Sequence, residues 1–213
     1  MVLMEDKLMD RLSAVFANRP IAIENEAEYL SSAVLVPLIK LKGEYHVLFE
    51  VLSSNLNRQP GEICFPGGRI EADETPLVAA VRETAEELGI ATEAITPLGP
   101  LNYVVATIGV ILHPFAACLA DNVQLKPNPH EVAEVFTVPL NWLLSVEPQE
   151  AYMEVATRPL DGFPLHLLPP DYPDNWKRRK SYPVLFYEYE QYVIWGLTAR
   201  VLYSFIRLCR EIK

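Results

Sequence analysis

The chain has 213 residues, with 18 Lys and Arg against 28 Asp and Glu, which gives a formal net charge of −10. Half of its residues are hydrophobic and 22% are charged. This balance excludes a disordered chain, because such chains lack the apolar surface that offsets the entropy of ordering. The acidic excess argues against nucleic-acid binding, which needs a basic surface. The length suits one domain with a modest extension.

The cysteines and the first residues favour a reducing, cytoplasmic location. An odd set of three cysteines without a C-x-x-C pair predicts neither a disulfide framework nor a structural zinc site. Residues 1–20 carry acidic side chains and no compact apolar core, so we expect no secretory signal. Residues 103–120 are apolar, but His113-Pro114 interrupts them, which favours buried strands over a membrane span. We therefore expect a cytoplasmic protein that binds neither membranes nor nucleic acids.

The first half of the chain predicts a helix, a hairpin, a loop and a second helix, in that order. Residues 4–17 predict a short amphipathic helix, and residues 32–39 and 45–52 predict two strands joined at Lys42-Gly43. Residues 53–68 are rich in Ser, Asn, Pro and Gly and predict a loop. The next helix is expected over residues 76–88, with Thr75 as its N-cap, Pro76 as its first residue and Gly89 as its stop.

The second half of the sequence predicts less regular structure, followed by a helix at the C-terminal end. We expect two or three strands between residues 98 and 138 and a short helix opening at Asn141-Trp142. Residues 153–189 are expected to be irregular, with strand-like runs near Leu165 and over 184–189. A final helix is expected over residues 197–212, with one buried stripe formed by Val201, Phe205, Leu208 and Ile212. These elements together favour one mixed α/β domain.

The helix expected over residues 76–88 carries an acidic face. Leu77, Val81, Thr84 and Leu88 form a stripe that should face the core, and the opposite sector holds Glu83, Glu86 and Glu87. Glu83 and Glu87 are four residues apart, and like charges at this spacing destabilise a helix. A solvated acidic face is one interpretation. The other is a carboxylate cluster for a hard divalent cation such as Mg²⁺.

The residues before this helix favour the metal-binding interpretation. Two glycines follow Pro66, and consecutive glycines let a ligand approach the main chain closely. From Gly68, five residues lead to Glu74 and seven more lead to Arg82-Glu83, followed by Glu86-Glu87 and Gly89. This spacing resembles the Nudix box, G-x5-E-x7-R-E-U-x-E-E-x-G-U, where U is bulky and aliphatic. Ile90 satisfies one U position, and Thr84 departs from the other.

The resemblance implies a fold, a reaction and a cofactor. The fold is an α/β Nudix-type α/β/α sandwich with a mixed β-sheet, which would span residues 31–213 after an N-terminal helix and lead-in over residues 1–30. The reaction is hydrolysis of a pyrophosphate bond in a nucleoside diphosphate derivative, with Mg²⁺ or Mn²⁺ as the cofactor. The metal neutralises the pyrophosphate and activates a water, and a glutamate accepts the proton. A homodimer is also expected from the resemblance.

The resemblance also assigns roles to individual residues. Glu83 and Glu87 match the principal metal ligands, with Glu86 as a third, and the structural positions of the box fall on Gly68, Glu74, Arg82 and Gly89. We expect Arg82 to pair with Glu74. The catalytic base is left open among the candidates Glu83, Glu86, Glu131 and Glu134. For Glu131 and Glu134 the alternative is an exposed loop or strand start.

From about Ser32 to Leu208 the chain resembles the coenzyme A pyrophosphatase branch of the family. The matching segments are Gly61-x3-Phe65-Pro66-Gly67-Gly68, Asn128-Pro129-His130-Glu131-Val132 and Ile194-Trp195-Gly196-Leu197-Thr198-Ala199-Arg200. Such enzymes split coenzyme A, or its thioesters, into 3′,5′-ADP and 4′-phosphopantetheine. Leu52 and Asn57 stand where the branch has arginines, and an arginine can bind phosphate bidentately. Our alternatives are therefore a hydrolase of ADP-ribose or a dinucleotide, and a non-catalytic Nudix-fold nucleotide-binding module.

Several residues are candidates for substrate binding. Gly67, Gly68, Arg58 and Arg69 surround the glycine loop, although Arg58 is one residue away from the branch position. The basic run Lys177–Lys180 is either a solvated loop or a replacement contact for a substrate phosphate. Tyr103 and Trp195 could stack on adenine, but we favour core packing for both. Cys64 is interpreted as a small buried hydrophobe rather than a nucleophile.

Overall fold

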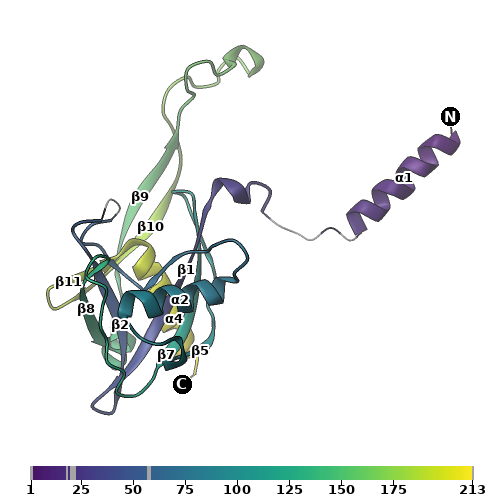
Figure 1. Ribbon diagram of the computed structural model, residues 1–213. Helices are drawn as coiled ribbons and strands as arrows, with labels where there is room; N and C mark the ends of the chain where they lie inside the picture. Colours follow the sequence, from purple (N-terminus) through teal and green to yellow (C-terminus); the bar gives the residue numbers. More distant parts are fainter. Residues whose placement is uncertain (1, 18, 20–22, 57–58, 213) are drawn as a thin grey trace.

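A mixed sheet forms the centre of the molecule (Figure 1). The computed structural model describes residues 2–17, 19, 23–56 and 59–212. Among these residues the sheet has eight strands: β1 (Leu30–Leu41), β2 (Glu44–Leu52), β3 (Ile63–Cys64), β4 (Gly67–Arg69), β5 (Ile95–Pro100), β6 (Val104–Ala106), β7 (Val110–Leu119) and β8 (Val132–Pro139). The sequence predicted two or three strands between residues 98 and 138. That number was too low, because short edge strands such as β6 carry little periodicity.

The central strand, β1, pairs with β2 on one side and with β7 on the other. The predicted hairpin is confirmed: β1 and β2 are antiparallel, with Leu41 opposite Glu44, and Lys42 and Gly43 turn the chain with φ of 49° and 91°. The pairing of β1 with β7 is parallel from Leu30 to Leu38. A central strand with neighbours on both sides and helices on both faces is expected to be almost continuously apolar, as β1 is.

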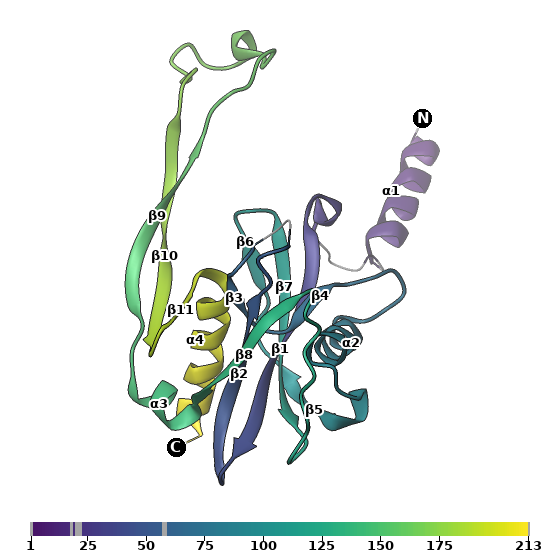
Figure 2. The same ribbon diagram turned by 60° about the vertical axis from the view of Figure 1, so that its left-hand side comes forward.

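Two helices cover opposite faces of the sheet (Figure 2). Because successive strand residues point to opposite faces, Leu48 packs towards α2 (Pro76–Leu88), and Phe49 packs towards α4 (Gly196–Glu211). The core is therefore split into two layers, and the predicted α/β/α arrangement is confirmed. The predicted stripe of α4 was partly wrong, because Leu208 and Ile212 are exposed. Its buried residues are Ala199, Val201, Leu202, Phe205 and Ile206.

A second sheet extends from the body as a long arm. Its strands are β9 (Gln149–Thr157), β10 (Lys177–Tyr189) and β11 (Tyr192–Trp195), and β9 pairs with β10 along almost its whole length (Figure 2). The sequence predicted an irregular stretch over residues 153–189, and its strand-like run over 184–189 is confirmed within β10, but the strands over residues 153–157 and 177–183 were missed. Much of the arm is exposed on both faces, so no alternation of polar and apolar residues marks its strands. Leu165, expected in a strand-like run, lies in the short 3₁₀ helix Leu165–Leu167.

The remaining helices are peripheral. The short helix expected at Asn141-Trp142 is confirmed as α3 (Leu140–Ser145). The N-terminal helix is also confirmed as α1 (Val2–Ala17), and both views show it standing apart from the body. Its apolar residues Leu8, Leu12, Val15 and Phe16 are exposed. Over the described ranges, no helix combines the length and apolar character that crossing a membrane would require.

Candidate active site

Helix α2 begins and ends where the sequence predicted. The Thr75 hydroxyl accepts a hydrogen bond from the Val78 N–H at 3.4 Å, and Pro76 occupies the first helical turn. Gly89 ends the helix in the left-handed conformation, with φ of 62°. A Cβ at Gly89 would lie 2.0 Å from the Lys126 carbonyl oxygen, so the chain passes there too closely for any other residue. These boundaries place the three box glutamates on the last two turns of α2.

Arg82 fastens the helix to the loop that precedes it. Its Nη2 lies 2.7 Å from Glu74 Oε1, and its Nε donates to Glu74 Oε2 at 3.2 Å. Glu74 also accepts the Glu71 N–H at 2.7 Å, and Arg82 donates to the Arg69 carbonyl oxygen at 3.4 Å. The hydrogen bonds from Arg82 hold the pKa of Glu74 below its usual range. The expected Arg82–Glu74 pair is confirmed, and it is bidentate.

The other terminal nitrogen of Arg82 is shared by two box glutamates. Arg82 Nη1 lies 2.9 Å from Glu83 Oε1 and 3.4 Å from Glu86 Oε2. The Glu83 side chain is largely covered, whereas that of Glu86 is 59% exposed. Burial raises the pKa of Glu83, and the hydrogen bond from Arg82 opposes that rise. Glu83 therefore faces the interior of the site, and Glu86 lies at its rim.

The glycine pair brings the main chain against the glutamates. Gly67 N–H donates to Glu87 Oε2 at 2.8 Å. Gly67 has φ of +150°, and a Cβ there would lie 2.2 Å from the Ala33 carbonyl oxygen. A Cβ on Gly68 would lie 2.4 Å from Glu83 Cδ. Both glycines thus allow an approach that a side chain would block, Gly67 to β1 and Gly68 to Glu83 of the acidic helix.

Sequence reasoning missed one acidic residue of the site. Glu50, on β2, is fully buried and lies next to Glu87, which is also buried. No hydrogen-bond partner for either Glu50 carboxylate oxygen is found among the described residues. Burial raises the pKa of both Glu50 and Glu87, and the charge of Glu50 adds to the rise at Glu87. A signal was present in the sequence, because Glu50 shares its strand face with Leu48 and should therefore point inward.

The cysteine beside this pair behaves as expected. Cys64 lies directly opposite Glu50 in the β2–β3 pairing. Burial, followed by the charges of Glu50 and Glu87, raises the pKa of its thiol well above the usual range. A thiol with a raised pKa stays neutral and is a poor nucleophile. Cys64 is only partly buried, but its neutral thiol agrees with the expectation that it is not a nucleophile.

The donor atoms of the site suit a hard divalent cation. Glu50, Glu83 and Glu87 present carboxylate oxygens in a poorly solvated space, and Mg²⁺ and Mn²⁺ prefer oxygen ligands. Two buried carboxylates without a positive partner are costly, and a cation would remove that cost. Over the described residues, no three Asp, Glu, His or Cys side chains already converge on one point. Arg82 holds Glu83 and Glu86 instead, and Mg²⁺ commonly needs just one or two carboxylates with several waters.

The two later glutamates lie in different places. Glu131 is held near the site: Asn128 Nδ2 donates to Glu131 Oε2 at 3.0 Å, and Asn128 N–H donates to the Glu87 carbonyl oxygen at 2.9 Å. The charge of Glu131 contributes to the raised pKa values of Glu50, Glu83 and Glu87. Glu134 shares the opposite sheet face with Phe136 and accepts a hydrogen bond from the Tyr192 hydroxyl. The fold thus brings Glu131, but not Glu134, to the acidic cluster.

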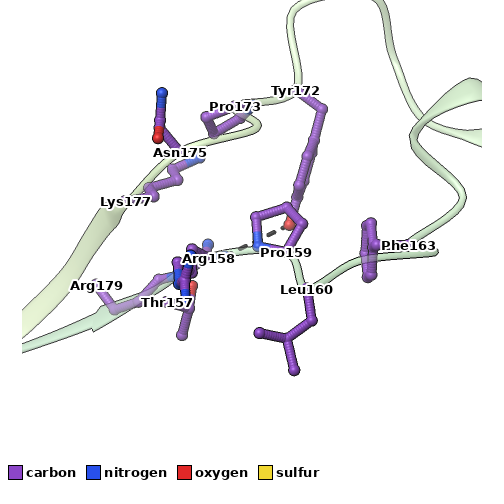
Figure 3. A pocket seen from close by; sticks show the side chains of 10 residues that line it. All are labelled: Thr157, Arg158, Pro159, Leu160, Phe163, Tyr172, Pro173, Asn175, Lys177 and Arg179. Carbon is purple, nitrogen blue, oxygen red and sulfur yellow. Dashed lines mark hydrogen bonds between the residues drawn. The ribbon is translucent and has the colours of Figure 1, made fainter.

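The basic run is a strand rather than the loop that we favoured. It opens β10, where Arg178 Nε pairs with Glu154 Oε2 at 2.9 Å, and Arg179 donates to the Thr157 hydroxyl at 2.5 Å. A hollow of about 350 Å³ lies at the end of the arm, and Lys177, Arg179 and Tyr172 are among the residues that line it (Figure 3). Asn57 and Arg58 lie outside the described residues. The Arg69 side chain is exposed, so its carbonyl oxygen, rather than its guanidinium, is tied to the box.

A larger cavity, of about 530 Å³, lies between β3, β6, β10 and the start of α4. Its walls are largely apolar, with two cations, and include Ile63, Val105, Met153, Lys180, Trp195 and Arg200. Thr198 donates from its hydroxyl to the Ile63 carbonyl oxygen at 3.0 Å, which joins α4 to β3. Trp195 is 43% exposed and Tyr103 is 62% exposed, so the expectation of core packing was wrong for both. Ile63 packs on the α4 side of the sheet, whereas the next residue, Cys64, pairs with Glu50, and the described residues that line this cavity include no carboxylate of the acidic cluster.

Comparisons with known proteins place these features in a family. The NUDIX domain model matches residues 30–158. The chain is 36% identical over 137 residues to the mouse peroxisomal coenzyme A diphosphatase NUDT7, covering 63% of this chain. It spans 56% of the length of that mouse protein. It is 31% identical over 174 residues to the Nudix hydrolase NudL of Photorhabdus laumondii, covering 81% of each chain.

Two solved structures are similar to part of this chain. The Mycobacterium smegmatis Nudix hydrolase RenU is 24% identical to this chain, with a TM-score of 0.46 over 55% of this chain and 74% of that one. A Caenorhabditis elegans Ap4A hydrolase in a binary complex is 23% identical, with a TM-score of 0.45 over 55% of this chain and 84% of that one.

Proposed function

This chain belongs to the Nudix family of pyrophosphohydrolases, and from that premise we propose that it hydrolyses coenzyme A or an acyl-CoA to 3′,5′-ADP and (acyl-)4′-phosphopantetheine. One observation carries the reaction type. The glycine loop donates its Gly67 N–H to the buried Glu87 and touches Glu83, so a pyrophosphate on that loop would meet the acidic cluster. The name of the mouse relative and the segments shared with the coenzyme A branch support the substrate.

The chain's own residues have distinct tasks in this reaction. Glu83 and Glu87 would hold Mg²⁺ or Mn²⁺, with Glu86 at the rim, and Arg82 keeps Glu83 oriented. The bound metal supplies charge neutralisation of the pyrophosphate and an acidified water. Glu131 is the candidate base that the fold supports best, because Asn128 holds its carboxylate beside the cluster. Metal dependence also explains how an acidic protein binds an acidic substrate.

The cavity of about 530 Å³ would receive the pantetheine arm. Pantetheine is long and weakly polar, which suits walls formed by Val105, Met153 and Trp195. Lys180 and Arg200 place positive charge at the same walls, where a substrate phosphate could bind. Of the basic run, we therefore assign Lys180 to the substrate, since Arg178 is paired with Glu154.

A second candidate substrate is ADP-ribose or a dinucleotide. Leu52, at the end of β2, stands where the coenzyme A branch has an arginine, and a leucine cannot bind phosphate. A non-catalytic nucleotide-binding module is a weaker alternative, because the glutamates of the box are intact and in contact with the glycine loop.

A substrate panel tests the proposal. The full chain is incubated with Mg²⁺ or Mn²⁺ and with coenzyme A, acetyl-CoA, ADP-ribose or a diadenosine polyphosphate, and the products are identified by mass. Release of 3′,5′-ADP from coenzyme A is the expected result. Cleavage of ADP-ribose without cleavage of coenzyme A would replace the substrate assignment, and binding without any turnover would favour the non-catalytic module.

A further inference from the structure

We propose that Glu50 is an additional cation-binding carboxylate of this site and that it, rather than Glu86, completes the set formed by Glu83 and Glu87. The inference rests on the proposed metal-dependent function and adds a residue outside the Nudix box. Glu50 lies on β2, which precedes the glycine loop, whereas the box glutamates lie on α2. The proposal therefore joins two elements of the fold at one cation.

The first argument is the condition of the Glu50 carboxylate. The Glu50 side chain is fully buried, and no hydrogen bond to either of its carboxylate oxygens is found over the described residues. More than about 90% of buried polar side-chain atoms in native proteins have a partner, so each exception needs an explanation. An uncompensated carboxyl in an apolar environment costs on the order of a few kcal/mol. A bound cation supplies the partner that the chain itself does not provide.

The second argument is the position of Glu50 among the other carboxylates. It faces Glu87, whose own Oε2 is held by the Gly67 N–H at 2.8 Å. Glu83 lies against Gly68, the residue after Gly67. Glu87 thus contacts both the glycine loop and Glu50, and Glu83 lies against the same loop from α2. The two negative charges of the buried Glu50 and Glu87 carboxylates balance the charge of one divalent cation. This pair is therefore a suitable binding site for Mg²⁺ or Mn²⁺.

The third argument is the position of Glu86. Its side chain is 59% exposed, and its Oε2 lies 3.4 Å from Arg82 Nη1. To bind a cation in the interior of the site, Glu86 would have to break its contact with Arg82. Its carboxylate would also have to give up its hydration. Glu50 needs neither change. We therefore expect Glu50 to contribute more to cation affinity than Glu86 does.

The test measures cation binding without substrate. Mn²⁺ is titrated into the full-length chain by calorimetry, and thermal unfolding is followed with and without MnCl₂. Glu50→Gln keeps the size of the side chain and removes its charge. Glu44→Gln, at the exposed start of the same strand, is the matched control. A ligand that binds the folded state raises the melting temperature, so both readouts report the same site.

We expect Glu50→Gln to weaken Mn²⁺ binding by about tenfold or more, a size comparable with losses seen when groups that support a metal site are removed. Its Mn²⁺-induced rise in melting temperature should shrink, while Glu44→Gln should match the wild type in both readouts. Glu86→Gln should weaken binding less than Glu50→Gln does. If Glu50→Gln does not fold, Glu50→Asp, which keeps the charge on a shorter side chain, should fold and bind Mn²⁺ more weakly than the wild type.

Mn²⁺ affinity of Glu50→Gln, or of Glu50→Asp where Gln does not fold, within twofold of the wild type would overturn the proposal. So would a wild-type chain that binds no Mn²⁺. Because substrate is absent, a failure to hydrolyse coenzyme A would change the proposed function and leave the cation-binding result intact. The two proposals can therefore fail separately.

Discussion

Replacing Gly68 by alanine should damage catalysis while leaving the fold in place. The added Cβ would lie 2.4 Å from Glu83 Cδ and 2.6 Å from its Oε1, whereas carbon atoms in contact normally stay about 3.5–4.0 Å apart. The Glu83 carboxylate would therefore have to move by about 1 Å. The Gly68 backbone is one that alanine adopts without strain, so the conflict is confined to that side chain.

A displacement of about 1 Å in a catalytic group can cost on the order of 10²-fold in rate, which corresponds to about 2.7 kcal/mol of transition-state stabilisation. The stability cost should be small, because Glu83 is partly solvated and its pairing with Arg82 resembles a surface ion pair worth at most about 1 kcal/mol. We therefore expect Gly68→Ala to melt close to the wild type and to lose about 10²-fold in kcat/KM on the best substrate of the panel.

Gly43→Ala is the control. Gly43 sits in the β1–β2 turn with φ of +91°, and a Cβ there would meet nothing within 4 Å. Alanine in this left-handed conformation should cost about 1–2 kcal/mol of stability and leave kcat unchanged. The two variants thus separate the effects on stability and on rate. Wild-type kcat/KM in Gly68→Ala would refute the reasoning, because Glu83 would then tolerate the displacement.

Three further predictions concern other residues of the site and its supports. Glu131→Gln should lower kcat strongly, and Glu134→Gln should not, since Glu134 lies on the opposite sheet face; equal losses in kinetic assays would contradict this placement. Glu74→Gln should destabilise the chain at pH 7. Its deficit in unfolding free energy should shrink as the pH falls below about 4.5 through the lowered pKa of Glu74, as denaturant titrations at several pH values would show. Lys180→Ala should raise KM for coenzyme A at low salt, whereas Arg178→Ala should leave KM unchanged; a similar KM for both would argue against the cavity.

The sequence predicted helix α2 and the β1–β2 hairpin well, because the residues that define them act on their immediate neighbours in the chain. Thr75 acts through its own hydroxyl, and Pro76 and Gly89 act through their own backbone, so these residues identified both ends of α2. The two β-rich runs in residues 32–52, joined at Lys42-Gly43, indicated the β1–β2 hairpin for the same reason. The exposed β9–β10 arm was missed, because strands that are exposed on both faces carry no periodic apolar signal.

The site was predicted in part, for a different physical reason. The spacing along α2 identified Glu83 and Glu87, and the Arg82–Glu74 pair followed from the box. Alternation with Leu48 indicates that Glu50 points inward, but its position beside Glu87 and the separation of Glu131 from Glu134 depend on which sheet face each strand turns towards the helix. Pairing between distant strands decides those faces, and one sequence does not reveal that pairing.

The central claim is that buried Glu87, held by the glycine loop, supports metal-dependent cleavage of a pyrophosphate bond. Glu87→Gln tests it most directly, because the amide oxygen can still accept the Gly67 N–H while the charge is removed. The measurement is kcat with saturating Mg²⁺ on the best substrate, together with the melting temperature. The account predicts a folded variant that has lost most of its activity. A folded Glu87→Gln variant that turns over at the wild-type rate would contradict it.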